Sequence, residues 1–214
     1  LVTGVEGVFL TNTDDAYWRD LCGERPDYII PRQMHNATRV NRSAGVDWLL
    51  HIDADEFVRR PETIPEAMNL APDRDVPVHF GMLERLRYAH DDSPQTMFAG
   101  AYRIPSDDFE MWGSEVYGRF AKFLKKGVSA HVVGKVLVPT GHDFIQGVHD
   151  AKTLDGTWVS PRPAGRHLYH FDGLTPLHMI LKLALRFDRP KVIAGMTQPD
   201  GPHRAQQMAF ATKH

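Results

Sequence analysis

Over the first sixty residues, short segments with the apolar pattern of strands alternate with short segments in which apolar residues have helical spacing. The expected elements, in chain order, are a strand at residues 5–10, a helix at 15–21, a strand at 28–30, a helix at 36–44 and a strand at 46–52. Pro31 would end the second strand, and Gly45 follows the second helix where helices commonly terminate. This alternation predicts an α/β domain built on a βαβ sheet.

The pattern continues beyond Pro61 with shorter blocks. The expected elements there are a helix at residues 65–70, strands at 76–83, 135–139, 144–149, 156–160 and 166–171, and a helix capped by Thr175. In this last helix Leu177, Ile180, Leu181, Ala184 and Leu185 fall on one face, which predicts a stripe that packs against the core. We expect residues 195–202 to form a loose tail.

Residues 91–118 are rich in glycine, proline and aromatic side chains. The glycines and prolines predict that no long helix or strand forms, whereas linkers rarely hold so many aromatic rings. We expect this segment to form a mobile wall or lid over a binding site, with aromatic rings such as Trp112 available to stack on a ligand. The alternative is an ordered loop whose rings fill the core.

Composition narrows the class of protein. The 214 residues are 42% hydrophobic and 24% charged, with a formal charge of -2, which is typical of a globular domain and excludes general electrostatic binding to nucleic acid. Cys22 is the single cysteine, so it forms neither an internal disulfide nor a thiolate zinc site, and it favours a reducing compartment. No apolar run reaches the roughly 18 residues that cross a bilayer, and no signal peptide is recognisable. We therefore expect a cytoplasmic location and no transmembrane segment.

Two carboxylates follow the strongest strand signal. Asp53 and Asp55 are two positions apart, so a continuing strand would place both on one side of the chain, at the edge where open α/β sheets bind ligands. Such oxygen donors suit Mg²⁺ or Mn²⁺, which complete their coordination with water and a substrate's phosphates. The alternative is a solvated acidic turn.

The run Trp48-Leu49-Leu50-His51-Ile52-Asp53-Ala54-Asp55-Glu56-Phe57 resembles the Asp-x-Asp-Glu-Phe signature of glycosyltransferases related to family 2, which have the GT-A fold. Weaker resemblances are Gly4-Val5-Glu6-Gly7-Val8-Phe9-Leu10, Asn12-Thr13-Asp14-Asp15, Gly134-Lys135-Val136, Gly147-Val148-His149, and Leu168-Tyr169-His170 with a helix containing Lys182. The family's first strand and helix, with an early Asn-Glu pair, have no counterpart before Leu1. The resemblance thus implies a GT-A-like, Rossmann-type mixed sheet with flanking helices that lacks its first strand.

The resemblance also implies a division of the chain and a reaction. Residues 1–214 would form one glycosyltransferase-like domain, with a nucleotide and metal half at 1–60, an acceptor half at 61–190 and a tail at 191–214. It would move a sugar from a nucleotide-diphosphate donor, UDP-sugar being the first choice, to a saccharide or other hydroxyl acceptor. The resemblance to the family favours a transfer that inverts the stereochemistry of the sugar's glycosidic bond.

Each candidate residue has a role in this hypothesis. Asp53, Asp55 and His149 would hold Mn²⁺ or Mg²⁺, with His170 as the second choice for the imidazole. The acidic turn of Asp14 and Asp15 would approach the nucleoside.

Cations and a base complete the expected site. Arg39 and Lys135 would meet the diphosphate, where positive charge stabilises the leaving group. Asp108 is the expected catalytic base, beside Phe109 and Trp112, because the attacking hydroxyl must lose a proton. Glu56 would point to the opposite side of a continuing strand and fix the loop.

Two other classes share part of this pattern. A phosphohydrolase of the haloacid dehalogenase kind also ends an apolar strand in Asp-x-Asp, but Glu56 stands where that class has a small or β-branched residue. A non-catalytic sugar-binding module could keep the aspartates without binding a donor. The sequence leaves these alternatives open.

Overall fold

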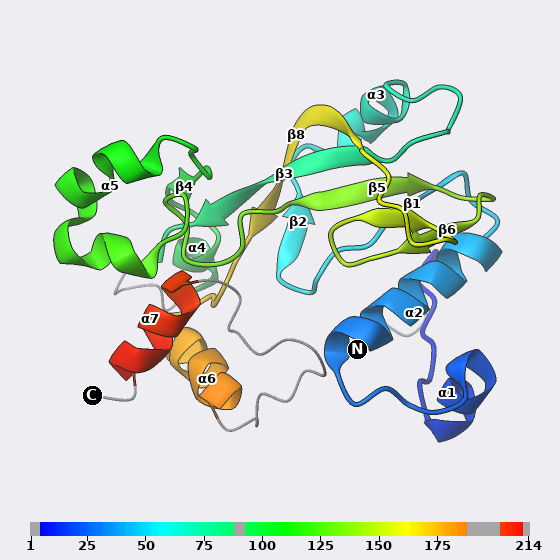
Figure 1. Cartoon of the computed structure of the whole chain (residues 1–214), viewed down its shortest axis with the longest axis horizontal. Coiled ribbons are helices and arrows are strands. Elements are labelled where there is room, and N and C mark those ends of the chain that lie inside the picture. Colours follow the sequence, from blue (N-terminus) through cyan, green and yellow to red (C-terminus); the bar gives the residue numbers. More distant parts are fainter. Residues whose placement is uncertain (1–4, 88–92, 188–201, 212–214) are drawn as a thin grey trace.

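The computed structural model describes residues 5–87, 93–187 and 202–211, and it has a curled mixed sheet flanked by helices (Figure 1). Five strands lie side by side in the order β1 (Trp48–Leu50), β5 (Lys135–Pro139), β3 (Val78–Arg85), β8 (Arg162–His170) and β2 (Glu56–Val58). A sixth, β4 (Tyr102–Arg103), pairs with the end of β3. The expected α/β class is confirmed.

Strand direction decides where a ligand can bind. Strand β5 is antiparallel to both β1 and β3, and β3 is parallel to β8, so β1, β3 and β8 all run the same way. Their carboxyl ends therefore share one edge with the first residues of β5 and β2, since β2 is antiparallel to β8. We call this the site edge.

Helices and a hairpin surround the sheet. They are α1 (Asp15–Cys22), α2 (Ile29–Ser43), α3 (Ile64–Met68), α4 (Pro94–Met97), α5 (Phe109–Tyr117), α6 (Pro176–Phe187) and α7 (Pro202–Ala211), the 3-10 turns η1 (Pro61–Thr63) and η2 (Gly118–Phe123), and the hairpin of β6 (Phe144–Gln146) and β7 (Ala151–Thr153). In the described part of the chain, no helix is both long and apolar enough to cross a membrane.

The core lies on the sheet and under α3. Val78, Phe80, Leu137 and Leu168 are almost fully buried on three adjacent strands, and Ala67 of α3 packs with them. Helix α2 is attached to the end of β5 and to the hairpin by polar contacts: Asn41 donates to the Pro139 carbonyl at 3.2 Å, and the Gln146 amide of β6 donates to Thr38 Oγ1 at 3.0 Å. Apolar packing and these buried hydrogen bonds hold the strands that carry the site.

Several sequence predictions are confirmed in detail. The helix predicted at residues 15–21 is α1, which begins at Asp15 as expected, and strand β5 has the predicted bounds. Asp14 caps α1 by accepting from the Tyr17 amide at 2.9 Å, a role that we did not predict. Thr175 caps α6, because its hydroxyl accepts from the His178 amide at 3.1 Å. Gly45 follows the end of α2 with a φ of 63°, which glycine adopts without strain.

Two predicted strands in the first thirty residues are wrong. Residues 5–10 form no strand and are exposed, with Phe9 at 92%, and they pair with no strand of the described chain. Residues 28–30 lead into α2, and Pro31 lies in its first turn, where backbone amides have no helical acceptor and proline costs no hydrogen bond. Proline thus begins this helix instead of ending a strand.

The glycine-rich segment contains a helix that we did not predict. Helix α5 holds Phe109 buried at 6% exposure, and Gly113 lies against its ring, since a Cβ there would meet Phe109 at 2.7 Å. Glycine here permits close packing. Trp112 contacts the Phe109 ring edge-on with centroids 5.1 Å apart, so the aromatic residues of this helix pack on one another.

Two other expectations fail at the carboxyl-terminal side. Residues 156–160 form no strand, only a bridge between Trp158 and Lys152. The predicted packing stripe on α6 is exposed at Leu177, Ile180 and Leu181 (65%, 61% and 53%). Of the residues predicted to be a loose tail, 195–201 lie outside the described residues, and Pro202 begins helix α7.

Gly134 precedes β5 where two backbones meet. A Cβ at this position would lie 1.7 Å from the Phe80 carbonyl oxygen, so Gly134→Ala forces β5 away from β3. We expect the free energy of unfolding to fall by about 3 kcal/mol, at the upper end for overpacking. Urea denaturation measures it. Gly156→Ala is the control, because Gly156 has a φ of 86° but open space, and it should cost only about 1 kcal/mol. Equal losses would contradict the close approach.

Candidate functional site

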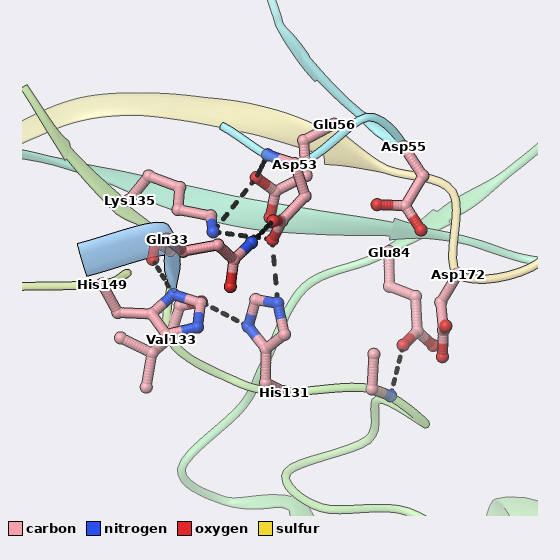
Figure 2. A network of polar contacts seen from close by, with 12 residues as sticks. Gln33, Asp53, Asp55, Glu56, Glu84, His131, Val133, Lys135, His149 and Asp172 are labelled. Carbon is pink, nitrogen blue, oxygen red and sulfur yellow. Dashed lines mark hydrogen bonds and ion pairs between the residues drawn. The ribbon is translucent and has the colours of Figure 1, made fainter. Parts of the chain in front are cut away.

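Charged and polar residues from separate segments of the chain meet at the site edge. The loop with Asp53 and Asp55 follows β1, Lys135 opens β5, and His170 ends β8. Figure 2 shows these side chains, apart from His170, around one space together with residues of α2 and of the segment before β5. Carboxyl ends of parallel strands are where open α/β sheets bind ligands, and this edge has three of them.

Asp53 is held from two sides. Its Oδ1 accepts a hydrogen bond from Gln33 Nε2 at 2.7 Å, and its Oδ2 accepts one from Lys135 Nζ at 2.8 Å (Figure 2). Burial alone would raise the pKa of Asp53, but the hydrogen bond and charge of Lys135 outweigh it and hold this pKa below its usual value. Asp53 is therefore an ionised, fixed carboxylate.

Glu56 fixes the loop, as predicted, but it also lies inside the site. Its Oε2 accepts from the Asp53 amide at 2.9 Å and is 3.4 Å from Lys135 Nζ. The chain turns after β1 instead of continuing as a strand, which brings Glu56 to the same side as Lys135. Only 1% of its side chain is exposed, and burial raises its pKa.

Asp55 meets a different cation from Asp53. Lys182 Nζ, from α6, donates to Asp55 Oδ2 at 2.9 Å and to Asp172 Oδ1 at 2.7 Å. Burial lowers the pKa of Lys182, but Asp172 and Asp55 outweigh this and raise it. The predicted shared orientation of Asp53 and Asp55 is thus wrong, because residues 53–55 form a turn.

Three histidines lie together beside these carboxylates. The ring centroid of His131 is 4.5 Å from that of His149 and 5.0 Å from that of His170. His131 Nδ1 is 2.5 Å from the Val133 carbonyl, and His149 Nδ1 is 2.9 Å from the Gly134 carbonyl. A carbonyl only accepts, so each Nδ1 carries the proton, and in a neutral ring each Nε2 is left with a lone pair.

The local environment lowers the pKa of two of these rings, His131 and His149. Burial, followed by the charges of His149 and His170, lowers the pKa of His131 to about 3. Burial and then the charge of Lys135 lower the pKa of His149. Neutral imidazole with its second nitrogen bonded to a backbone carbonyl is the form in which histidine binds metals.

Among the residues that the structure describes, two groups of three side chains have ligand atoms within 4.8 Å of one another, close enough to share a metal ion. One is Glu56, His131 and His170, and the other is Asp55, His170 and Asp172. Of the expected ligands, Asp55 and the second choice, His170, belong to these groups. Asp53 and His149 belong to neither, since Gln33 and Lys135 already engage Asp53.

Glu84 supports the segment that carries His131. This carboxylate, fully buried at the end of β3, accepts from the Ser129 amide at 2.9 Å and the Ala130 amide at 2.6 Å, and it pairs with Arg103. Glu84 thus fixes the backbone one residue before His131.

The residues expected to bind the nucleotide are more dispersed. Asp14 is a helix cap, Asp15 is exposed in the first turn of α1, and the Arg39 guanidinium lies 4.8 Å from the centre of the Tyr17 ring. Lys135 is fully buried between Asp53 and Glu56, so it orders the aspartate loop. The expected roles of Asp14 and Asp15 at the nucleoside, and of Arg39 and Lys135 at the diphosphate, stay predictions.

Asp108 is exposed at the start of α5 and makes no capping hydrogen bond. Its neighbour Asp107 pairs with Lys126. Figure 1 shows α5 at one end of the molecule, beyond β4 and away from β1. The structure therefore does not bring Asp108 together with the aspartate loop, and its role as a base stays a prediction.

A hollow of about 500 Å³ adjoins His149. Its lining includes His79, Val133, Asp150, Trp158 and Ser160. Trp158 is 56% exposed there and offers a flat ring beside a carboxylate and a hydroxyl. Such a mixture of aromatic and polar groups suits the faces and hydroxyls of a sugar.

His131, Asp172, Gln33 and Glu84 were not among the predicted residues. A signal existed for Asp172, because His170-Phe171-Asp172 repeats after β8 the two-residue spacing of Asp53-Ala54-Asp55 after β1. His131 and Gln33 have no local signal, since the loop before β5 and one turn of α2 reach the site only through folding. Comparisons of the chain with protein-family models, curated proteins and solved structures found no match.

Proposed function

We propose that this chain is a metal-dependent glycosyltransferase that moves a sugar from a nucleotide-diphosphate donor, with UDP-sugar as first choice, to a saccharide acceptor. One observation carries the proposal: the Asp53-Ala54-Asp55 loop lies at the shared carboxyl edge of three parallel strands, and Asp55 forms a metal-capable group there with His170 and Asp172. The resemblance of residues 48–57 to the family signature agrees with it.

The donor set fits the expected cation. Two carboxylates and one imidazole suit Mn²⁺, and Mg²⁺ would rely on the carboxylates alone. Lys182 already places one positive charge between Asp55 and Asp172, which shows that this pair stabilises a cation. A bound ion would neutralise the diphosphate as the bond to the sugar breaks.

The chain's own residues would orient the reactants. Gln33 and Lys135 fix Asp53, and Glu56 fixes the backbone of the same loop, so the loop needs little reorganisation on binding. The hollow beside His149 would hold a sugar, with Trp158 stacking on one face. Asp150, which lines this hollow, joins Asp108 as a candidate to take the acceptor's proton.

Calorimetry with UDP tests the first step. The protein treated with EDTA and dialysed should not bind UDP measurably, and added Mn²⁺ should restore binding, because an ion held by the carboxylates would supply positive charge for the diphosphate. Turnover of a panel of UDP-sugars should follow the same dependence on Mn²⁺.

Other results would favour the alternatives. UDP binding that is equal in EDTA would contradict the metal assignment. Rapid hydrolysis of an aryl phosphate with Mg²⁺, lost in Asp53→Asn, would instead support a phosphohydrolase. Mn²⁺-dependent UDP binding without any transfer or donor hydrolysis would support a binding module.

A further inference from the structure

We propose that Glu56, His131 and His170 form a binding site for a divalent ion of the zinc class, different from the carboxylate-rich group to which the proposed transferase would bind Mn²⁺. The three ligand atoms come from the start of β2, the loop before β5 and the end of β8, and they lie within 4.8 Å of one another.

The first argument is the pairing of Glu56 with His131. Glu56 Oε1 and His131 Nε2 face each other at 3.8 Å (Figure 2). Because His131 Nδ1 donates to Val133, its Nε2 carries a lone pair in the neutral ring, and a carboxylate oxygen carries lone pairs as well. Two lone pairs that face each other repel, and this repulsion is strongest on the side of Glu56, which is 1% exposed, whereas His131 is 32% exposed. A cation between the two atoms would turn this repulsion into attraction.

The second argument is His170. Only 5% of this residue is exposed, and its Nδ1 has no hydrogen-bond partner among the described residues. Its ring lies 5.0 Å from that of His131. A buried ring nitrogen without a partner costs free energy in the absence of a ligand, and metal binding removes this cost.

The remaining atoms of the group are already held in place. Glu56 Oε2 binds the Asp53 amide, which leaves Oε1 for an ion. Glu84 holds the backbone of Ala130, next to His131. Outer contacts of this kind orient metal ligands and strengthen binding.

The donor types select the ion. Two imidazoles and one carboxylate suit Zn²⁺, Co²⁺ or Ni²⁺, whereas Mg²⁺ and Mn²⁺ prefer sites richer in oxygen. Zinc binds these atoms at about 2.0–2.2 Å, so a separation of 3.8 Å between two ligand atoms fits one ion between them after small side-chain movements.

The two groups share His170, so one ion excludes the other. Zinc bound by Glu56 and His131 would therefore compete with Mn²⁺ at Asp55 and Asp172. This competition rests on the proposed function, but zinc binding itself does not, and the two are measured separately.

The test uses the whole chain, freed of metal by a chelator and dialysed. Calorimetry with Zn²⁺ should give one site, and Co²⁺ should give the visible absorption of low-symmetry nitrogen and oxygen ligation. His131→Ala should weaken Zn²⁺ binding by at least about 100-fold, since even outer partners of metal ligands are worth 10- to 100-fold. His142→Ala is the matched control, because His142 is exposed and outside the group.

A second readout keeps the test valid if a variant is unstable. Zn²⁺ should raise the melting temperature of the wild type and of His142→Ala, but not that of His131→Gln. Asp172→Asn should keep Zn²⁺ binding while losing Mn²⁺ binding. Absence of Zn²⁺ binding in the wild type, or equal binding by His131→Ala, would overturn the proposal, and neither result depends on UDP or a sugar.

Discussion

Asp55→Asn should reduce Mn²⁺-dependent UDP binding and sugar-nucleotide turnover by about 100-fold or more, because it removes one of two carboxylates that would hold the ion. The shape of the side chain is kept, and Lys182 retains its ion pair with Asp172, so the fold should be unaffected. Calorimetry with UDP and Mn²⁺, together with turnover measured at saturating Mn²⁺, checks the loss.

The control for this change is Asp47→Asn. Asp47 is an exposed carboxylate paired with Arg74, so its loss should leave UDP binding unchanged and cost less than about 1 kcal/mol of stability. Full Mn²⁺-dependent binding by Asp55→Asn would exclude Asp55 as a ligand.

Lys135→Met should lower the free energy of unfolding by about 3–5 kcal/mol, the range for removing one partner of a buried ion pair. Lys135 is fully buried between Asp53 and Glu56, and without it two carboxylates face each other with little solvent. Chemical denaturation measures the loss. Adding Glu56→Gln should recover part of it, because glutamine removes one of the two charges and its oxygen still accepts from the Asp53 amide.

Lys126→Met is the matched variant. Lys126 pairs with Asp107 on the surface, and this change should cost less than about 1 kcal/mol. If Lys135→Met costs no more than Lys126→Met, Lys135 does not neutralise the aspartate loop, and our description of this loop is wrong.

The sequence was sufficient for elements whose signals are local. Helix α1 has its own capping aspartate, α6 its capping threonine, and β5 an unbroken apolar run. The apolar run at residues 5–10 was misleading, because a strand needs a partner and the described chain offers none. The apparent strand at 28–30 failed because proline is as compatible with the first turn of a helix as with the end of a strand.

The candidate site could be predicted only in part. Asp53 and Asp55 were found because both stand in one short motif. Their orientation depends on a turn after β1, and the strand-like alternation of side chains gave no indication of this turn. The partners that decide their chemistry are distant in sequence: Lys135 is 82 residues from Asp53, and Lys182 is 127 residues from Asp55. Only the tertiary structure places Glu56 opposite His131, since nothing near either residue indicates the other.

The contact of Lys182 with Asp55 and Asp172 links the position of α6 to the charge of the aspartate loop. A metal ion that enters this group has to compete with the ammonium, so its net affinity is the intrinsic affinity reduced by the free energy of the two ion pairs. By the reciprocity of linked equilibria, the ion weakens the hold of the sheet on α6 by the same amount. Helix α6 should therefore be attached most firmly when the loop has no ion, and a bound ion would weaken the attachment of its exposed apolar face to the edge of the sheet.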